Sequence, residues 1–139
     1  MLAERNKLIP QSEIRKMYNM AFGRKNVLDM TVGLPDFETP GFIIEAAKKA
    51  MDDGFTKYTH NAGLLEVREA LSRKLKRENN IIADPETEIV CTVGGMGTLV
   101  LTNMTLVNPG DEVIYPDPGF VSHRSHVLLT GGKPVPVQL

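Results

Sequence analysis

The last third of the sequence alternates short apolar runs with helix-forming runs, and glycine or proline separates them. A short apolar run between turn signals indicates a buried strand, whereas a longer run with apolar residues at helical spacing indicates a helix. Strands that alternate with helices favour an α/β fold, in which right-handed crossovers build a parallel sheet. The expected order is strand, helix, strand, helix, strand, over Glu88–Val93, Thr98–Val107, Val113–Tyr115, Phe120–Leu129 and Val135–Leu139.

The residues before this alternation predict helices joined by irregular segments. Gln11–Phe22 carries apolar residues at helical spacing, with Ser12 as its N-cap and Gly23 as its end. Thr39-Pro40 is typical of a cap followed by proline in the first helical turn, and the helix that follows should end at Gly54.

The middle of the chain predicts a loop and a longer helix. Val27–Val32 reads as a short strand or an extended piece, and Phe55–Gly63 as a polar loop. The helix after the loop, about Leu65–Glu78, places its apolar residues on one face. Its other side is charged, and we interpret it as a solvated face rather than a basic binding patch: Arg68, Glu69, Arg73, Lys74 and Lys76.

Charge and composition exclude several classes of protein. The 16 basic and 17 acidic residues give a net charge of −1 without a basic stripe, which argues against a dedicated nucleic-acid binder. No apolar run approaches the roughly 20 residues of a membrane span, and the first residues lack the apolar stretch of a secretory signal. Cys91 is the single cysteine, so no internal disulfide can form, and we expect a reducing, cytoplasmic compartment.

The glycine-rich segment after the first predicted strand carries the strongest local chemistry. A glycine-rich turn that opens a helix exposes backbone N–H groups where the helix dipole is positive, so an anion fits there. A dinucleotide, a lone phosphate and a tight turn without a ligand all remain open. Gly95 and Gly97 match two glycines of the dinucleotide fingerprint, and Asp117 lies 20 residues beyond Gly97, but Val100 occupies the third glycine position.

Other chemistry-bearing residues have simpler interpretations. His123 and His126 are three residues apart on a predicted helix, but no third ligand is evident, so we expect surface histidines rather than a metal site. Ser122 is adjacent to His123, and neighbours on a helix point in different directions, which excludes a nucleophile pair. Cys91 should be a small core side chain within the first strand.

Taken together, several segments resemble the fold-type I aminotransferases that use pyridoxal phosphate, the class that includes aspartate aminotransferase. Their order and spacing match the family across nearly the whole chain. The segments are Ser12–Arg15, Gly33–Pro40, Lys57–Gly63 with Leu65–Arg68 after it, Val93–Leu99, Asn108–Val113, and Pro116-x-Pro118-x-Phe120.

The resemblance implies a fold and a cofactor site. The fold would be the first part of the large, cofactor-binding α/β domain over residues 41–139, with 1–40 as an N-terminal arm and small-domain segment. Backbone N–H groups of Gly95 and Met96 would bind the phosphate of pyridoxal phosphate. Phe120 would stack on the pyridine ring, where family members often carry Tyr or Trp. Tyr58 is similar to the tyrosine that reaches the phosphate of the neighbouring subunit, so a homodimer is implied.

The resemblance also implies two substrate contacts. Gly33 matches the glycine whose backbone approaches the substrate carboxylate, where a side chain would be in the way. Ile14 is similar to an apolar residue of the N-terminal helix that covers the substrate. The substrates would be an amino acid and a 2-oxo acid, with lyases of the same family as a related possibility.

No catalytic residue of the family is present in this stretch. The lysine that forms the Schiff base with the cofactor would lie well past Leu139, where the chain stops inside a predicted strand. Lys133 alone among the lysines follows small residues, but it opens the last strand, which is the wrong place. We therefore expect an inactive N-terminal portion of an aminotransferase. The alternatives are a non-catalytic dimerisation or regulatory fragment and a small dinucleotide-binding domain.

Overall fold

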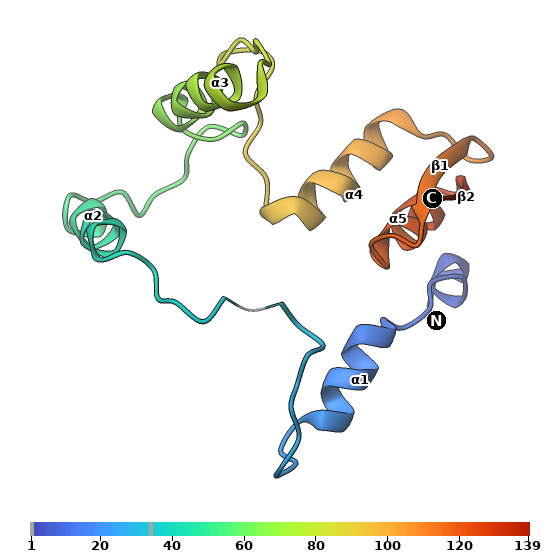
Figure 1. Cartoon of the computed structure of the whole chain (residues 1–139). Helices are drawn as coiled ribbons and strands as arrows, with labels where there is room; N and C mark the ends of the chain where they lie inside the picture. The colour runs from blue at the N-terminus through green and yellow to red at the C-terminus, as the bar shows by residue number, and fades with distance from the viewer. Residues whose placement is uncertain (1, 34) are drawn as a thin grey trace. The chain divides into compact units, whose positions relative to one another are not determined.

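The computed structural model describes residues 2–33 and 35–139, which form two compact units. Unit 1 combines Met1–Leu34 with Gly94–Leu139, and unit 2 is Pro35–Val93. Figure 1 labels the elements of both units. Unit 1 contains the 3-10 helix η1 (Glu4–Lys7), helices α1 (Glu13–Ala21), α4 (Gly94–Leu106) and α5 (Ser122–Leu129), and strands β1 (Glu112–Asp117) and β2 (Lys133–Gln138). Unit 2 contains helices α2 (Gly41–Asp52) and α3 (Leu65–Asn79).

The strands of unit 1 confirm the predicted α/β arrangement. β1 and β2 pair in parallel, from Glu112 opposite Lys133 to Asp117 opposite Gln138. Parallel strands need a crossover, and α5 provides it and packs against both strands (Figure 1). Val127 of α5 is 2% exposed and forms the centre of this small core.

The start of α1 also agrees with the sequence. The Ser12 side-chain oxygen accepts a hydrogen bond from the backbone N–H of Arg15 at 3.4 Å, which makes Ser12 the predicted N-cap. At α2 the prediction was wrong by one residue. Pro40 is the N-cap without a side-chain hydrogen bond, and the helix begins at Gly41 rather than at Pro40.

The expected first strand, Glu88–Val93, is not formed among the described residues. Strands need a partner in a hydrogen-bonded ladder, and the sheet of the described residues contains β1 and β2 alone. The segment instead has a backbone hydrogen bond from Cys91 N–H to the Ala62 carbonyl at 2.9 Å. Ile89 is buried, and the Cys91 side chain is half-buried rather than in a strand core.

Two further expectations, on the glycine-rich segment and on Arg68, were wrong. The glycine-rich segment is the first turn of α4 rather than a separate turn, because the helix begins at Gly94. Arg68 of α3 does not belong to a solvated face, since its side chain reaches backbone carbonyls and the residue is 5% exposed. Lys74, on the same helix, does stay at the surface and pairs with Glu78 at 2.9 Å.

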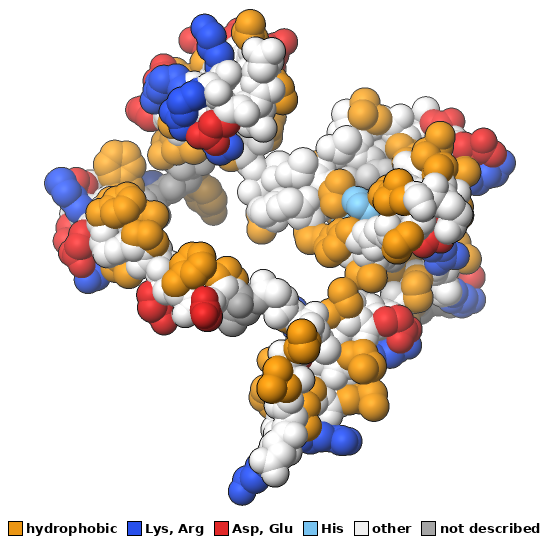
Figure 2. All heavy atoms as spheres, viewed as in Figure 1, with side chains coloured by type: hydrophobic (Ala, Val, Ile, Leu, Met, Phe, Trp, Pro, Cys, Tyr) orange, Lys and Arg blue, Asp and Glu red, His pale blue; other side chains and the backbone are white. Residues whose placement is uncertain are grey.

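Large hydrophobic side chains lie mostly at the surface of both units. Figure 2 shows them over the exterior of α1 and of α2. α4 is apolar around its circumference, a composition typical of a helix covered on all sides, yet it exposes Leu101, Met104 and Leu106. Within the described residues, no helix has the length and apolar character needed to cross a membrane.

Candidate functional site

The N-terminus of α4 is shaped to receive an anion. Gly94 begins the helix with a φ of +65°, a conformation that glycine adopts most readily. In the first turn, the N–H groups of Gly95 and Met96 have no acceptor within the helix, and the dipole makes this end positive. A Cβ placed on Gly95 would meet no described atom within 4 Å, so a ligand can approach the backbone there.

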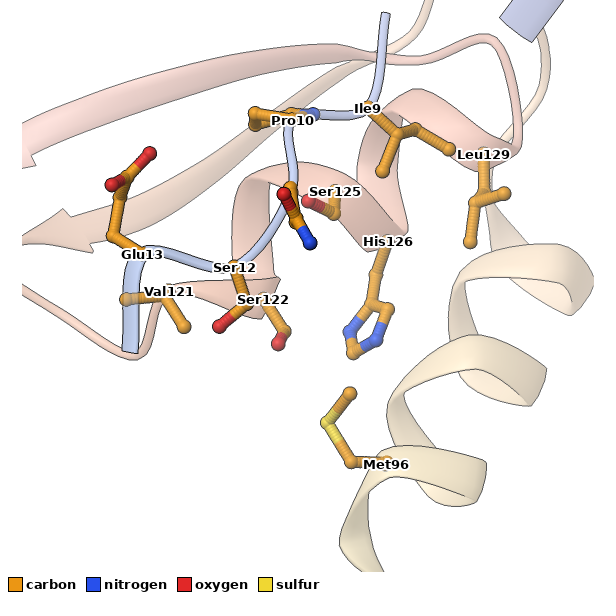
Figure 3. A pocket seen from close by; sticks show the side chains of 11 residues that line it. Ile9, Pro10, Ser12, Glu13, Met96, Val121, Ser122, Ser125, His126 and Leu129 are labelled. Atoms are coloured by element: carbon orange, nitrogen blue, oxygen red, sulfur yellow. The ribbon is translucent and has the colours of Figure 1, made fainter. Parts of the chain in front are cut away.

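Met96 lies at the wall of a cavity of about 430 Å³ within unit 1. Figure 3 shows its side chain facing residues of α5 and of the N-terminal segment. The cavity has an apolar part and several polar groups, which is typical of a small-molecule pocket. Its walls are Ile9, Pro10, Gln11, Ser12, Glu13, Met96, Val121, Ser122, Ser125, His126 and Leu129.

The α5 wall of this cavity was missed in the sequence, although a signal was present. Ser122, Ser125, His126 and Leu129 follow the spacing i, i+3, i+4 and i+7, which places them on one helix face. Serine and histidine occupy three of the four positions, so this face lacks the apolar periodicity that indicates a packed helix face. The same face carries the two hydroxyl groups and the imidazole that line the pocket.

His126 is a buried histidine rather than the surface histidine that we expected. It is 4% exposed, and its Nδ1 atom has no hydrogen-bond partner among the described residues. Its ring points toward the Met96 side chain (Figure 3). Burial lowers the pKa of His126 below its usual value of 6.5, and the nearby His123 lowers it further. Folding therefore favours the neutral form of the imidazole.

The free energy of unfolding should fall in acid because of His126. The unfolded chain takes up a proton near pH 6.5, whereas the folded state resists protonation until a lower pH. The stabilising contribution is thus complete above pH 6.5 and is lost as the pH falls through the folded-state pKa. His123 on the same helix and Glu13 on the facing wall are the other titratable groups here.

Urea unfolding between pH 5 and 7, followed by tyrosine fluorescence, measures this slope. His126→Leu should flatten the pH dependence of the free energy of unfolding. The variant also lacks the unpartnered nitrogen, so its stability relative to wild type should increase as the pH falls toward 5. Ser125→Ala, on the same face of α5 but without a titratable group, is the matched control and should keep the wild-type slope. An unchanged slope in His126→Leu would contradict the assignment.

Phe120 precedes α5 and presents a half-exposed ring. Its ring meets that of His123 edge-on, with centroids 5.7 Å apart and planes at 80°. An edge-on neighbour orients an aromatic ring without covering its whole face. Phe120 itself does not line the cavity, but the next two residues, Val121 and Ser122, do. The structure thus brings Met96 and the start of α5 to one cavity.

The predicted substrate residues lie elsewhere in unit 1. Ile14 is on α1 and is 36% exposed, one residue beyond the cavity-lining Glu13. A Cβ on Gly33 would meet no described atom within 4 Å, so packing within the described chain does not require glycine there. Neither residue is among those that line the cavity.

Tyr58 belongs to unit 2 and sits on the loop between α2 and α3. Its side chain is fully exposed, and Tyr58 lines two surface pockets together with Lys57. A wholly exposed aromatic side chain contributes nothing to the packing of its own unit. The phenol is therefore available to another molecule or another part of the protein.

The sequence left open a dinucleotide site at Asp117 and a metal site at His123 and His126. Asp117, the acid of the dinucleotide interpretation, accepts a hydrogen bond from the Gln138 side chain at 3.0 Å through its carboxylate. In the described part of the chain, no group of three metal-ligating side chains lies together. The pair His123 and His126 therefore has no third ligand among the described residues.

Comparison with known proteins places the chain in a family. The family model for aminotransferase class I and II matches residues 25–139. The aspartate aminotransferase of Pyrococcus abyssi is 46% identical over 98% of this chain, and aromatic-amino-acid aminotransferase 2 of Thermococcus litoralis is 43% identical over 98%. In each case the chain spans 35% of the relative's length.

Solved structures agree with the sequence relatives. A crystal structure of Pyrococcus protein-A1 matches 97% of this chain with a TM-score of 0.93 and 46% identity, over 35% of its own length. The aspartate aminotransferase of Thermus thermophilus with maleate matches 99% of this chain with a TM-score of 0.91 and 38% identity, over 37% of its own length. The chain has the fold of their corresponding part. It belongs to the class I and II aminotransferases.

Proposed function

We propose that this chain is the N-terminal portion of an aminotransferase that moves an amino group between an amino acid and a 2-oxo acid through pyridoxal phosphate. One observation carries the proposal: the α4 N-terminus is open at Gly95 and lies beside a ligand-sized cavity, in a chain of this family. The chain spans about a third of its relatives, so the activity is proposed for the longer protein.

The described residues fit a phosphate-bearing aromatic cofactor. The N–H groups of Gly95 and Met96 would bind phosphate oxygens, because they lie in the first turn of α4 and no neighbouring segment crowds the Cβ position of Gly95. Phe120, whose ring is half exposed, would stack on the pyridine ring. When bound, the cofactor supplies an electron sink for the substrate's α-carbon. These residues would hold it in place and shield one face of its ring from water.

Tyr58 and α4 support a homodimer. Tyr58 is fully exposed, so its phenol is free to reach the phosphate bound by a second copy. α4 exposes Leu101, Met104 and Leu106 although its composition is that of a buried helix. We propose that a second copy contributes Tyr58 to the cofactor site, in a cytoplasmic protein.

Ile14 and Gly33 remain our proposed substrate contacts, and residues 1–40 and 41–139 our proposed division into an arm and a cofactor-binding domain. The relatives differ in the amino acid for which they are named. They are named for aspartate, for aromatic amino acids and for N-acetyl-LL-diaminopimelate, at identities between 40% and 46%.

A titration of the purified chain tests the phosphate site. Pyridoxamine 5′-phosphate should bind saturably and about tenfold or more tightly than pyridoxamine, because charged hydrogen bonds at the helix N-terminus act on the phosphate alone. Both probes carry an amine, so neither reacts with lysine. Equal affinity for the two probes would refute the proposed phosphate site.

The same chain should show no transaminase activity and no absorbance band of lysine-linked cofactor. No lysine of the sequence matches the family's reacting lysine. Lys133 pairs with Glu112 in the parallel ladder, and its backbone N–H binds the Asp111 carbonyl at 2.7 Å. Absorbance spectra with pyridoxal phosphate, in wild type and in Lys133→Met, measure the outcome. A stable band that disappears in Lys133→Met would contradict this expectation.

A further inference from the structure

Arg68 of α3 is a buried cation that binds backbone oxygens. The residue is 5% exposed, and its guanidinium donates hydrogen bonds to three carbonyls. Its Nε atom reaches the Gly63 carbonyl at 3.2 Å, and Nη1 reaches the Glu86 carbonyl at 3.1 Å and that of Pro85. A buried charge is costly unless it is fully hydrogen-bonded, so this arrangement ties three segments of unit 2 together.

One of the three segments is the turn that ends the Tyr58 loop. The backbone N–H of Gly63 donates to the His60 carbonyl at 2.8 Å, and that of Ala62 donates to the His60 Nδ1 atom at 3.2 Å. Arg68 holds the Gly63 carbonyl at the end of this turn. Only Thr59 separates the turn from Tyr58.

The turn is held from its other side as well. The N–H of Cys91 donates to the Ala62 carbonyl at 2.9 Å. Gly63 has a φ of +95°, and a Cβ there would lie 2.9 Å from both the Cβ and the Sγ of Cys91. The backbone of Gly63 is thus fixed between the Arg68 guanidinium and Cys91, with no room for a side chain.

The turn at Gly63 is held by hydrogen bonds, whereas the Tyr58 side chain on the same loop has no such contacts from packing. Tyr58 is fully exposed and gains no position from packing, so its place depends on the backbone anchors of the loop. We propose that Arg68 is a positioning residue that fixes the loop and thereby the Tyr58 hydroxyl. This inference rests on the proposed function in one respect, namely that the hydroxyl is presented to a cofactor phosphate.

Arginine suits this role better than lysine. The planar guanidinium directs several N–H groups along fixed lines, so it can hold separate carbonyls at the same time. A lysine ammonium on a flexible stem could keep one of the carbonyls in place, but not the set. Arg68→Lys therefore preserves the charge and removes the geometry, which separates the two contributions.

Fluorine NMR of the chain labelled with 3-fluorotyrosine tests the positioning role directly. The three tyrosines give separate probes, and Tyr58→Phe assigns the signal of Tyr58. In Arg68→Lys the Tyr58 signal should sharpen, because the loop backbone that carries this exposed ring becomes more mobile. Tyr18 and Tyr115 lie in unit 1 and should be unchanged, which distinguishes loss of loop position from general unfolding.

Arg73→Lys is the matched control, because Arg73 is an exposed arginine of the same helix. It should leave all three fluorine signals in place. Should Arg68→Lys unfold unit 2, Gly63→Ala disturbs the same turn with the guanidinium intact, and it should sharpen the Tyr58 signal in the same way. A Tyr58 signal whose width stays unchanged in both variants would overturn the proposal.

A binding cycle separates this inference from the proposed function. If Tyr58 contacts the phosphate, Tyr58→Phe and Arg68→Lys should each weaken pyridoxamine 5′-phosphate binding by about tenfold. The double variant should bind no more weakly than either single variant, because both act through one hydroxyl. Independent effects that multiply would refute action through Tyr58. Absent binding in the wild type would refute the proposed function, while the fluorine spectra would still decide the role of Arg68.

Discussion

Replacing Gly95 with aspartate should weaken the binding of pyridoxamine 5′-phosphate by about tenfold or more. The new carboxylate would stand beside the backbone N–H groups at the start of α4, in space that is open in the wild type. There it would compete with the phosphate for those donors and repel its charge. Isothermal titration measures the change in affinity.

The same substitution should not destabilise the helix. A negative side chain in the first turn interacts favourably with the helix dipole, and it typically contributes about 0.3–1 kcal/mol. Gly95→Ala is the matched control, since its methyl group meets no described atom within 4 Å. Affinity should therefore fall in the aspartate variant while thermal stability is kept or raised. A loss of affinity that follows a loss of helix content would point to unfolding rather than to a phosphate site.

Replacing Gly132 with alanine should lower the free energy of unfolding of unit 1 by about 1–3 kcal/mol. The new Cβ would lie 2.8 Å from the Val107 side chain, 3.0 Å from that of Val127, and 3.3 Å from the Asp111 carbonyl. The residue is buried at the point where the chain leaves α5 for β2, and its N–H binds the Val127 carbonyl at 3.2 Å. Overpacking is costly here because the backbone cannot move away.

Urea unfolding followed by circular dichroism measures this effect. Gly95→Ala again serves as the control, because it adds the same methyl group to unit 1 in open space. The control should be neutral or slightly stabilising, since alanine favours helix over glycine. Equal stability of Gly132→Ala and wild type would show that the α5–β2 junction is more loosely packed than the distances indicate.

The features that the sequence predicted correctly depend on neighbouring residues. Ser12 caps α1 because its oxygen needs to reach an amide only three residues away. The helix before Leu129 and the strand after it were found because turn residues separate two runs of different periodicity. The order strand, helix, strand then allowed a parallel pair, which β1 and β2 form.

The errors concern residues whose state depends on distant partners. Glu88–Val93 has the apolar composition of a strand, but strand formation needs a neighbouring strand, and its backbone contacts the loop at Ala62 instead. Arg68 has the spacing of a surface residue, and yet carbonyls up to 18 residues away satisfy its guanidinium in the interior. Histidine is a residue type common at the surface, but His126 is buried and forms part of a cavity wall.

The α/β class, the approximate limits of most helices and the family resemblance could be predicted from the sequence. These properties rest on local backbone preferences and on residue spacing, which act over a few residues. Two features depend on the tertiary structure: His126 lines a cavity with Met96, and Arg68 anchors the Tyr58 loop. Burial and hydrogen bonding between distant segments are set by how the chain folds back on itself, and no local pattern encodes which partner a side chain will meet.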